Sequence, residues 1–131
     1  MKKLRKMKSL RNEATQVFNE YIRRRDADKN GVNTCVTCGK REHYSNMNAS
    51  HFYHGKNWQS ALDERNVFPA CRGCNLYKHG NLIEYGEFLR KKFGSEIIDI
   101  LRELRHQGWK PSRQELEDII ETYKKKLEGL K

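Results

Sequence analysis

The sequence contains no long hydrophobic run. No stretch approaches the roughly 20 apolar residues that a helix needs to cross a bilayer, and no apolar signal core follows the basic residues 1–6. We therefore expect neither membrane insertion nor secretion, and we predict a cytoplasmic protein. In that reducing compartment, cysteines serve more often as metal ligands than as disulfides.

Hydrophobic and acidic side chains are both scarce. Hydrophobic residues make up 36% of the 131 residues and charged residues 34%, so a single domain would have a thin core that needs a staple such as a metal. The 27 Lys and Arg against 17 Asp and Glu give a formal net charge of +10. This excess favours a polyanionic partner, with nucleic acid first and an acidic membrane surface second. A basic protein without an anionic partner is the third interpretation.

Helical periodicity occupies both ends of the chain. Residues 1–11 contain six basic side chains and no acid, which predicts a basic arm. An apolar period predicts a helix over 12–28. The stretch 82–131 predicts a helical cap, in which Ser112 and Glu115 form a capping-box pattern.

The segment 32–81 between these helices holds all four cysteines and four of the five histidines. It contains short β-prone pieces around His51 and Val67, and a short helix is expected after Cys71. We found no internal repeat and no linker, so the prediction is one α+β domain over 1–131.

Two C-x2-C pairs, Cys35–Cys38 and Cys71–Cys74, are separated by 32 residues. Each pair predicts a tight turn that directs two thiolates at one centre, and four thiolates form the closed shell of a structural Zn²⁺. A redox-active dithiol and an iron–sulfur cluster are the competing interpretations. A closed zinc site has no open ligand position, so we do not expect it to be the reaction centre.

Side chains suited to phosphodiester cleavage stand between and after the two pairs. His51 is a candidate general base, because a neutral imidazole can deprotonate water, and His54 is a reserve base. Asn75 and His79 are four residues apart, so one face of a short helix could present both to a divalent cation. Asn75 and Asn81 could instead serve as helix caps.

Several separated blocks of residues 14–90 together resemble one family. The blocks are Phe18-Asn-Glu-Tyr-Ile-Arg23, Cys35-x-x-Cys38-Gly39, Ala49-x-His51-Phe52, Arg65-Asn66-Val67 and Cys71-x-x-Cys74-Asn75-x-x-Lys78-x-Gly80-Asn81-Leu82. In this order they are similar to the phage lambda NinG (Rap) recombination nucleases, which belong to the HNH (His-Me finger) superfamily. The resemblance implies a zinc-stapled ββα-metal core, with an N-terminal helix and C-terminal helices around it.

The resemblance also implies roles for single residues. It makes His51 the general base on the first strand and Asn66 the asparagine that orients it from the second strand. Arg65 would contact the scissile phosphate. The candidate ligands for a catalytic Mg²⁺ or Mn²⁺ are Asn75, His79 and Asn81.

Two positions depart from the family pattern. An acidic ligand often precedes the catalytic histidine, where this chain has Ser50. NinG relatives often have an aspartate three residues before that histidine, where this chain has Asn48. Both changes remove negative charge, which weakens the binding of a divalent cation. A DNA-binding descendant without catalysis is therefore an alternative.

The resulting prediction is a metal-dependent DNA endonuclease. The resemblance implies branched recombination intermediates, such as Holliday junctions or D-loops, as substrate, and the bacterial host cytoplasm if the protein is phage-encoded. A homodimer would suit a four-way junction. Phosphate contacts are predicted for Lys2, Lys3, Arg5, Lys6, Lys8, Arg23, Arg24, Arg25 and Lys78. The rival is a non-catalytic zinc-ribbon module, acting as a recombination adaptor, which would not need His51.

Overall fold

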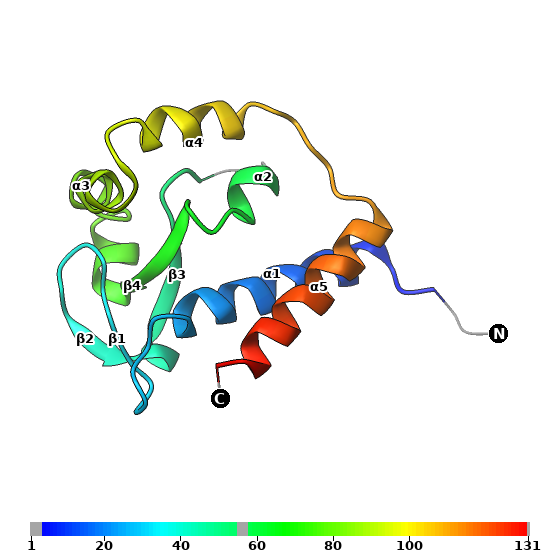
Figure 1. The fold of residues 1–131 in the computed structure, drawn as a ribbon, viewed down its shortest axis with the longest axis horizontal. Helices are drawn as coiled ribbons and strands as arrows, with labels where there is room; N and C mark the ends of the chain where they lie inside the picture. Colours follow the sequence, from blue (N-terminus) through cyan, green and yellow to red (C-terminus); the bar gives the residue numbers. More distant parts are fainter. Residues whose placement is uncertain (1–3, 55–57, 131) are drawn as a thin grey trace.

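A computed structural model describes residues 4–54 and 58–130 and has a mixed α+β fold (Figure 1). The helices are α1 (Met7–Arg24), α2 (Trp58–Ala61), α3 (Leu82–Phe93), α4 (Ile97–Arg105) and α5 (Arg113–Glu128). The strands are β1 (Val32–Thr34), β2 (Arg41–His43), β3 (Met47–His51) and β4 (Val67–Cys71), with the short helical turns η1 (Tyr44–Asn46) and η2 (Gly73–Tyr77). The predicted α+β class is confirmed. None of the helices in the described ranges combines the length and the apolar character needed to cross a membrane.

The strands β3 and β4 form an antiparallel pair in the middle of the molecule. Met47 lies opposite Cys71 at one end of this pair, and His51 lies opposite Val67 at the other. Every residue of β4 is buried. Since successive side chains of a strand point to opposite faces, β4 must be covered on both faces.

Helices provide that cover. The cluster on one face consists of Val67, Phe18 and Ile22 of α1, and Tyr123 of α5. The cluster on the other face consists of Phe68, Tyr85 and Leu89 of α3, and Ile97 and Leu101 of α4. Figure 1 shows the same order, with α1 and α5 on one side of the β3–β4 pair and α3 and α4 on the other. The pair is therefore the middle layer of the fold.

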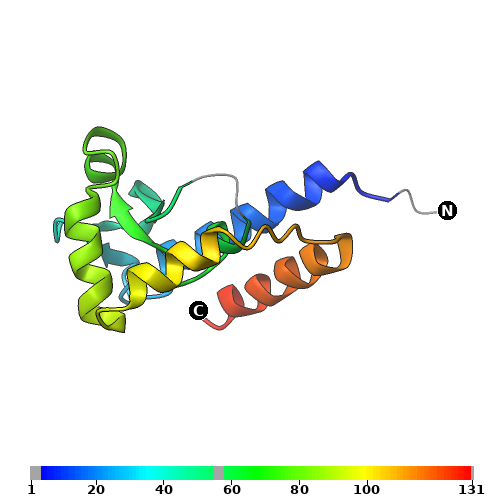
Figure 2. The same cartoon turned by 90° about the horizontal axis from the view of Figure 1, so that it is seen from above.

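The helix α5 packs along α1, so the first and the last helix of the chain lie side by side (Figures 1 and 2). Leu10 and Ala14 of α1 meet Leu116 and Ile120 of α5 in one buried cluster. Burying a leucine or isoleucine side chain contributes about 1.5–3 kcal/mol. The buried leucine and isoleucine side chains of this cluster therefore stabilise the packing of α5 against α1.

The predicted capping box at the start of α5 is confirmed. The backbone amide of Glu115 donates to Ser112 Oγ at 3.1 Å, and the backbone amide of Ser112 donates to the Glu115 carboxylate at 3.0 Å. These bonds satisfy two amides that a helix start would leave without partners.

The boundaries of the first helix differ from the predicted ones. We predicted an arm over 1–11 and a helix over 12–28, whereas α1 begins at Met7 and ends at Arg24. Leu10 is buried against α5, and this contact favours helical structure well before residue 12. At the other end, the Asp28 carboxylate accepts backbone hydrogen bonds in a turn that has already left the helix.

A polar network joins α1, the turn before β4 and α5. Arg25 donates to Glu64 Oε1 at 3.2 Å, while Tyr123 and Lys126 donate to Glu64 Oε2 at 2.9 and 2.8 Å. Burial alone would raise the pKa of Glu64, but the hydrogen bonds from Lys126 and Tyr123 and the charge of Arg25 lower it. The Arg25 side chain is only 12% exposed, and its guanidinium lies 4.4 Å from the Phe68 ring centre. This corrects the phosphate contact predicted for Arg25, whose charge is used inside the fold.

Candidate functional site

The four cysteines converge at one end of the β3–β4 pair. Cys35 and Cys38 lie in the turn after β1, Cys71 ends β4, and Cys74 lies in η2. All four are free thiols, and their sulfur atoms lie within 4.8 Å of one another. The predicted convergence is confirmed, and four thiolates at this spacing fit the donor set of a structural zinc ion.

Backbone hydrogen bonds shape the first of the two cysteine turns. The Cys35 amide donates to the Lys40 carbonyl at 2.8 Å, and the Gly39 amide donates to the Cys35 carbonyl at 2.9 Å. Gly39 has a φ of +81°, a left-handed conformation that glycine adopts without steric cost. The turn thereby brings Cys35 and Cys38 to the same centre.

The thiols of this cluster differ in acidity. Burial alone would raise the pKa of Cys35, but hydrogen bonds from the Thr37 hydroxyl and from backbone amides lower it to about 6. The backbone amide of Lys40 lowers the pKa of Cys38, whereas burial and hydrogen bonds with the other three thiols raise it to about 12. One thiolate therefore forms readily while a neighbour keeps its proton. A zinc ion would displace the remaining protons, because it binds thiolates.

Asn81 lies at this cysteine cluster. Its side-chain amide donates to Cys74 Sγ at 3.8 Å, and it is the residue that precedes α3, with a φ of +52°. Its side chain makes no capping hydrogen bond to α3. This hydrogen bond fixes Asn81 beside a sulfur atom of the four-cysteine cluster.

The short helix predicted after Cys71 is present, but only as the turn η2. The turn η2 is π-helical and ends at Tyr77. The Gly80 amide then donates to the Cys74 carbonyl at 2.9 Å, which folds the chain back, and His79 and Gly80 both have positive φ values of 50° and 86°. The prediction that Asn75 and His79 share one helix face is therefore wrong. Asn75 is half-buried on η2 and His79 is exposed beyond it.

His51 ends β3 and is half-buried. Its Nε2 lies 3.1 Å from the carbonyl oxygen of Ala61 in α2. A carbonyl can only accept a hydrogen bond, so in the neutral ring Nε2 carries the proton and Nδ1 carries the lone pair. Burial lowers the pKa of His51 below its usual value of 6.5, and the charge of His54 lowers it further, against the raising effect of backbone hydrogen bonds at Ala61 and Ala49. The ring is therefore neutral at pH 7.

Asn66 lies one residue before β4 and is fully buried. Its side chain donates to the carbonyls of Tyr53 and Ser60 at 3.1 and 2.9 Å and accepts from the Tyr53 amide at 2.9 Å. These bonds tie the segment after His51 to α2, which contains the carbonyl that binds the His51 ring. Asn66 makes these bonds from a turn and not from the strand itself, and its role in orienting the histidine stays a prediction.

Two further positions of the expected site, Arg65 and Ser50, lie in different surroundings. Arg65 makes a paired contact with the Asp63 carboxylate at 3.0 and 2.9 Å, and its side chain is 42% exposed. Its contact with a scissile phosphate stays a prediction. Ser50 is fully buried, and its hydroxyl has no hydrogen-bond partner among the described residues. A side chain this enclosed does not reach a hydrated cation at the surface.

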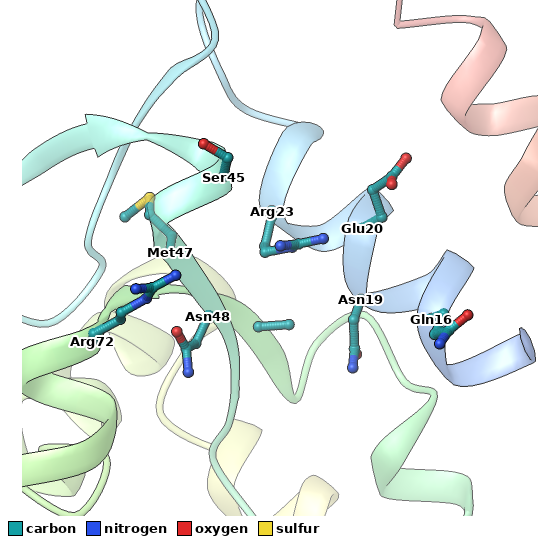
Figure 3. Close-up of a pocket in the computed structure, with 9 residues that line it drawn as sticks. Gln16, Asn19, Glu20, Arg23, Ser45, Met47, Asn48 and Arg72 are labelled. Atoms are coloured by element: carbon teal, nitrogen blue, oxygen red, sulfur yellow. The ribbon is translucent and has the colours of Figure 1, made fainter. Parts of the chain in front are cut away.

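The basic side chains predicted to hold phosphates fall into different settings. Arg5 pairs with Glu13, and Arg24 pairs with Glu20 at 3.2 Å. Lys6, Lys8 and Lys78 are exposed, whereas Lys2 and Lys3 lie outside the described residues. Arg23 lines a polar cleft beside β3 together with Arg72 (Figure 3). The sequence prediction missed Arg72, which stands between the cysteines of the second pair, where its charge was the available signal.

The fold and the site define a small mixed α+β protein with a cluster of four cysteines that could bind a metal ion. The family model described as Bacteriophage Lambda NinG protein matches residues 1–131, and the chain belongs to this family. It is 32% identical over 126 residues to Protein ninG of Escherichia phage 933W, and 31% identical over 126 residues to those of Salmonella phage P22 and Escherichia phage lambda. These alignments cover 91% of this chain but only 56–57% of the relatives, so the chain spans little more than half their length. No solved structure matches the chain.

Proposed function

We propose that the chain is a metal-dependent DNA endonuclease of the HNH type in which His51 activates water. The observation that carries this proposal is the hydrogen bond between His51 Nε2 and the Ala61 carbonyl. It leaves Nδ1 unprotonated, and the lowered pKa keeps the ring neutral at pH 7. This is the state that a general base needs before it accepts a proton from water.

The order of elements around His51 supports the same proposal. The histidine ends β3, β4 returns antiparallel to it, and the helical turn η2 follows at once. This order agrees with the hairpin and helix of a ββα-metal core. The four-cysteine cluster would staple β4 and η2 to the turn after β1, with a zinc ion in a structural role.

The predicted ligands fit a catalytic Mg²⁺ or Mn²⁺ only in part. Asn75 and His79 offer an amide oxygen and an imidazole, while Asn48 and Ser50 stand where relatives carry acids. Among the described residues, the group of three or more His, Cys, Asp or Glu side chains that lie close enough to hold a metal ion is the four cysteines. A divalent cation would stabilise charge on the phosphate and on the departing oxygen. With so few charged ligands we expect weak binding, and imidazole favours Mn²⁺ over Mg²⁺.

DNA is the proposed substrate because of the formal charge of +10 and the family. The same proposal includes branched recombination intermediates as the substrate, a homodimer on a four-way junction, and action in the host cytoplasm. The rival function is a recombination adaptor that binds nucleic acid without cutting it. The observation in its favour is that Asn48 and Ser50, an amide and a hydroxyl, stand at the expected acidic positions.

Cleavage of labelled DNA by wild type and two histidine variants tests the proposal. Four-way junction, flapped and linear DNA are incubated with Mg²⁺ or Mn²⁺, and binding is measured in parallel. We expect His51→Ala to cut at least about 100-fold more slowly while it binds normally. His54→Ala is the matched control and should keep most of the activity.

The possible outcomes separate the two functions. Equal cleavage by wild type and His51→Ala would reject His51 as the base, and loss of cleavage in His54→Ala alone would transfer the role to His54. Normal binding without cleavage by any of the proteins would favour the adaptor.

A further inference from the structure

A polar cleft of about 620 Å³ lies between α1 and β3. Its polar lining comes from four places in the chain: Gln16, Asn19, Glu20 and Arg23 belong to α1, Ser45 to η1, Asn48 to β3, and Arg72 follows β4. Figure 3 shows Asn48 and Arg72 on one side of β3 and the α1 side chains on the other. The volume is within the range of about 300–1,000 Å³ that is typical of ligand sites.

The cleft contains two arginines whose charge is not used elsewhere. Within the described residues, neither the Arg23 nor the Arg72 guanidinium has a hydrogen bond or an ion pair, in contrast to Arg24 and Arg25 beside them in α1. Glu20 is the one carboxylate in the lining, and it pairs with Arg24 at 3.2 Å. The cleft therefore presents two free planar cations, which match the geometry of a phosphate group.

Amide side chains complete the lining. Gln16, Asn19 and Asn48 each offer a donor and an acceptor, the combination that pairs with the edge of a nucleic-acid base. Asn19 Oδ1 is buried and has no hydrogen-bond partner among the described residues. A buried acceptor of this kind is ready for a donor supplied by a ligand.

We propose that this cleft binds one unpaired nucleotide of a DNA strand. Arg23 and Arg72 hold its flanking phosphates, and the amides contact the base edge. A base inside a duplex is stacked on its neighbours and cannot enter a cleft between a helix and a strand unless it is unstacked. Single-stranded flaps and branch points expose such bases already, so the cleft selects DNA with unpaired positions.

This inference rests on the proposed function, because β3 connects the cleft to His51. Ala49 lines the cleft, and His51 follows two residues later on the same side of the strand. A strand rises about 3.3 Å per residue, so the two positions are about 7 Å apart. A nucleotide held in the cleft would bring the next phosphodiester of the same strand toward the imidazole.

Binding measurements without cleavage test the cleft. Zinc-loaded protein is titrated, with no Mg²⁺ or Mn²⁺ added, against a single-stranded oligonucleotide of about 12 nucleotides and against a blunt duplex of the same sequence. The variants are Arg23→Gln and Arg72→Gln. The matched control is Arg102→Gln, which removes an exposed guanidinium from α4. Thermal melting verifies that all four proteins fold alike.

We expect each cleft variant to bind the single strand about tenfold more weakly. The slope of the logarithm of affinity against the logarithm of salt concentration should also become shallower by about 0.7, the value for one phosphate contact on a single strand. Arg102→Gln should stay within about twofold of wild type. Unchanged single-strand affinity in both cleft variants would overturn the proposal, and so would an equal loss on the blunt duplex. Because no cleavage is measured, these results are independent of whether His51 is a catalytic residue.

Discussion

The two ends of the β3–β4 pair are built in different ways. At one end, opposite Met47, Cys71 joins three other cysteines whose sulfur atoms lie within 4.8 Å of one another. At the other end, opposite Val67, the His51 ring contacts the backbone carbonyl of Ala61 at 3.1 Å. The first end has a complete set of ligands supplied by side chains. The second has one reactive group that depends on the position of a neighbouring helix.

Because of this difference, we expect substitutions at the two ends to have different consequences. A four-thiolate site is closed, so its stability comes from the ligands themselves and the metal they bind. The His51 end depends instead on Asn66, which ties the segment after β3 to α2 by three side-chain hydrogen bonds. We therefore expect substitutions at the cysteine end to affect folding and substitutions at the histidine end to affect the reaction first.

The largest expected effect is at the cysteine end. Replacing Cys74 by Ser removes a buried ligand, and zinc binding contributes about 10–16 kcal/mol in small zinc domains, as much as the whole stability of a typical domain. We expect Cys74→Ser, or wild type treated with a chelator, to lose its cooperative melting transition. Zinc content per chain and thermal unfolding would check this. A normal transition in a zinc-free protein would show that the metal is dispensable.

An intermediate effect is expected for Asn66→Ala at the histidine end. The substitution leaves the part-buried backbone groups of Tyr53 and the buried carbonyl of Ser60 without their partners, at a cost of about 3 kcal/mol. Denaturant unfolding measures the loss, and zinc content should stay at the wild-type level. A loss below about 1 kcal/mol would mean that these groups find other partners.

The pH dependence of the histidine end should run in one direction. The folded-state pKa of His51 is lowered below its usual 6.5, so between the two values the unfolded chain binds more protons. The contribution of His51 to stability is then complete above about pH 6.5 and falls as the pH decreases. Cleavage should likewise be constant above pH 6.5 and fall only below it, as the imidazole becomes protonated. The difference in unfolding free energy between wild type and His51→Gln, measured from pH 8 to 5, checks the sign.

The smallest effect is expected for Thr37→Val at the cysteine end. The Thr37 hydroxyl lies 3.2 Å from Cys35 Sγ and is the main hydrogen bond that lowers the pKa of this thiol. Its loss should cost about 1 kcal/mol and leave one zinc ion per chain. Competition with a chromogenic chelator would report the weaker binding. An effect as large as that of Cys74→Ser would contradict the view that the ligands themselves supply the stability.

Local patterns in the sequence predicted much of the frame. The two cysteine pairs, the strands around His51 and Val67, and the Ser112–Glu115 capping box all depend on spacing over a few residues. Each is found in the structure. The family was also predicted from separated motifs.

Other features could not be predicted because they depend on contacts distant in the sequence. The early start of α1 reflects the burial of Leu10 against α5. The burial of Arg25 depends on Glu64, which lies 39 residues later. The end of η2 at Tyr77 is by contrast a local effect, because the Gly80 amide turns back to bond the Cys74 carbonyl.

The amino-acid sequence alone fixes which reactive and charged groups the protein has: four thiols in two turns, an imidazole at the end of a strand, and an excess of positive charge. Which of these groups can reach a ligand depends on how the chain packs. Packing leaves Arg23 and Arg72 unpaired in one cleft while it encloses Arg25, and it sets the tautomer of His51 through a carbonyl ten residues away. The physical reason is that residue type sets charge and ligand character, whereas burial and hydrogen-bond partners are set by elements that meet only in the folded chain.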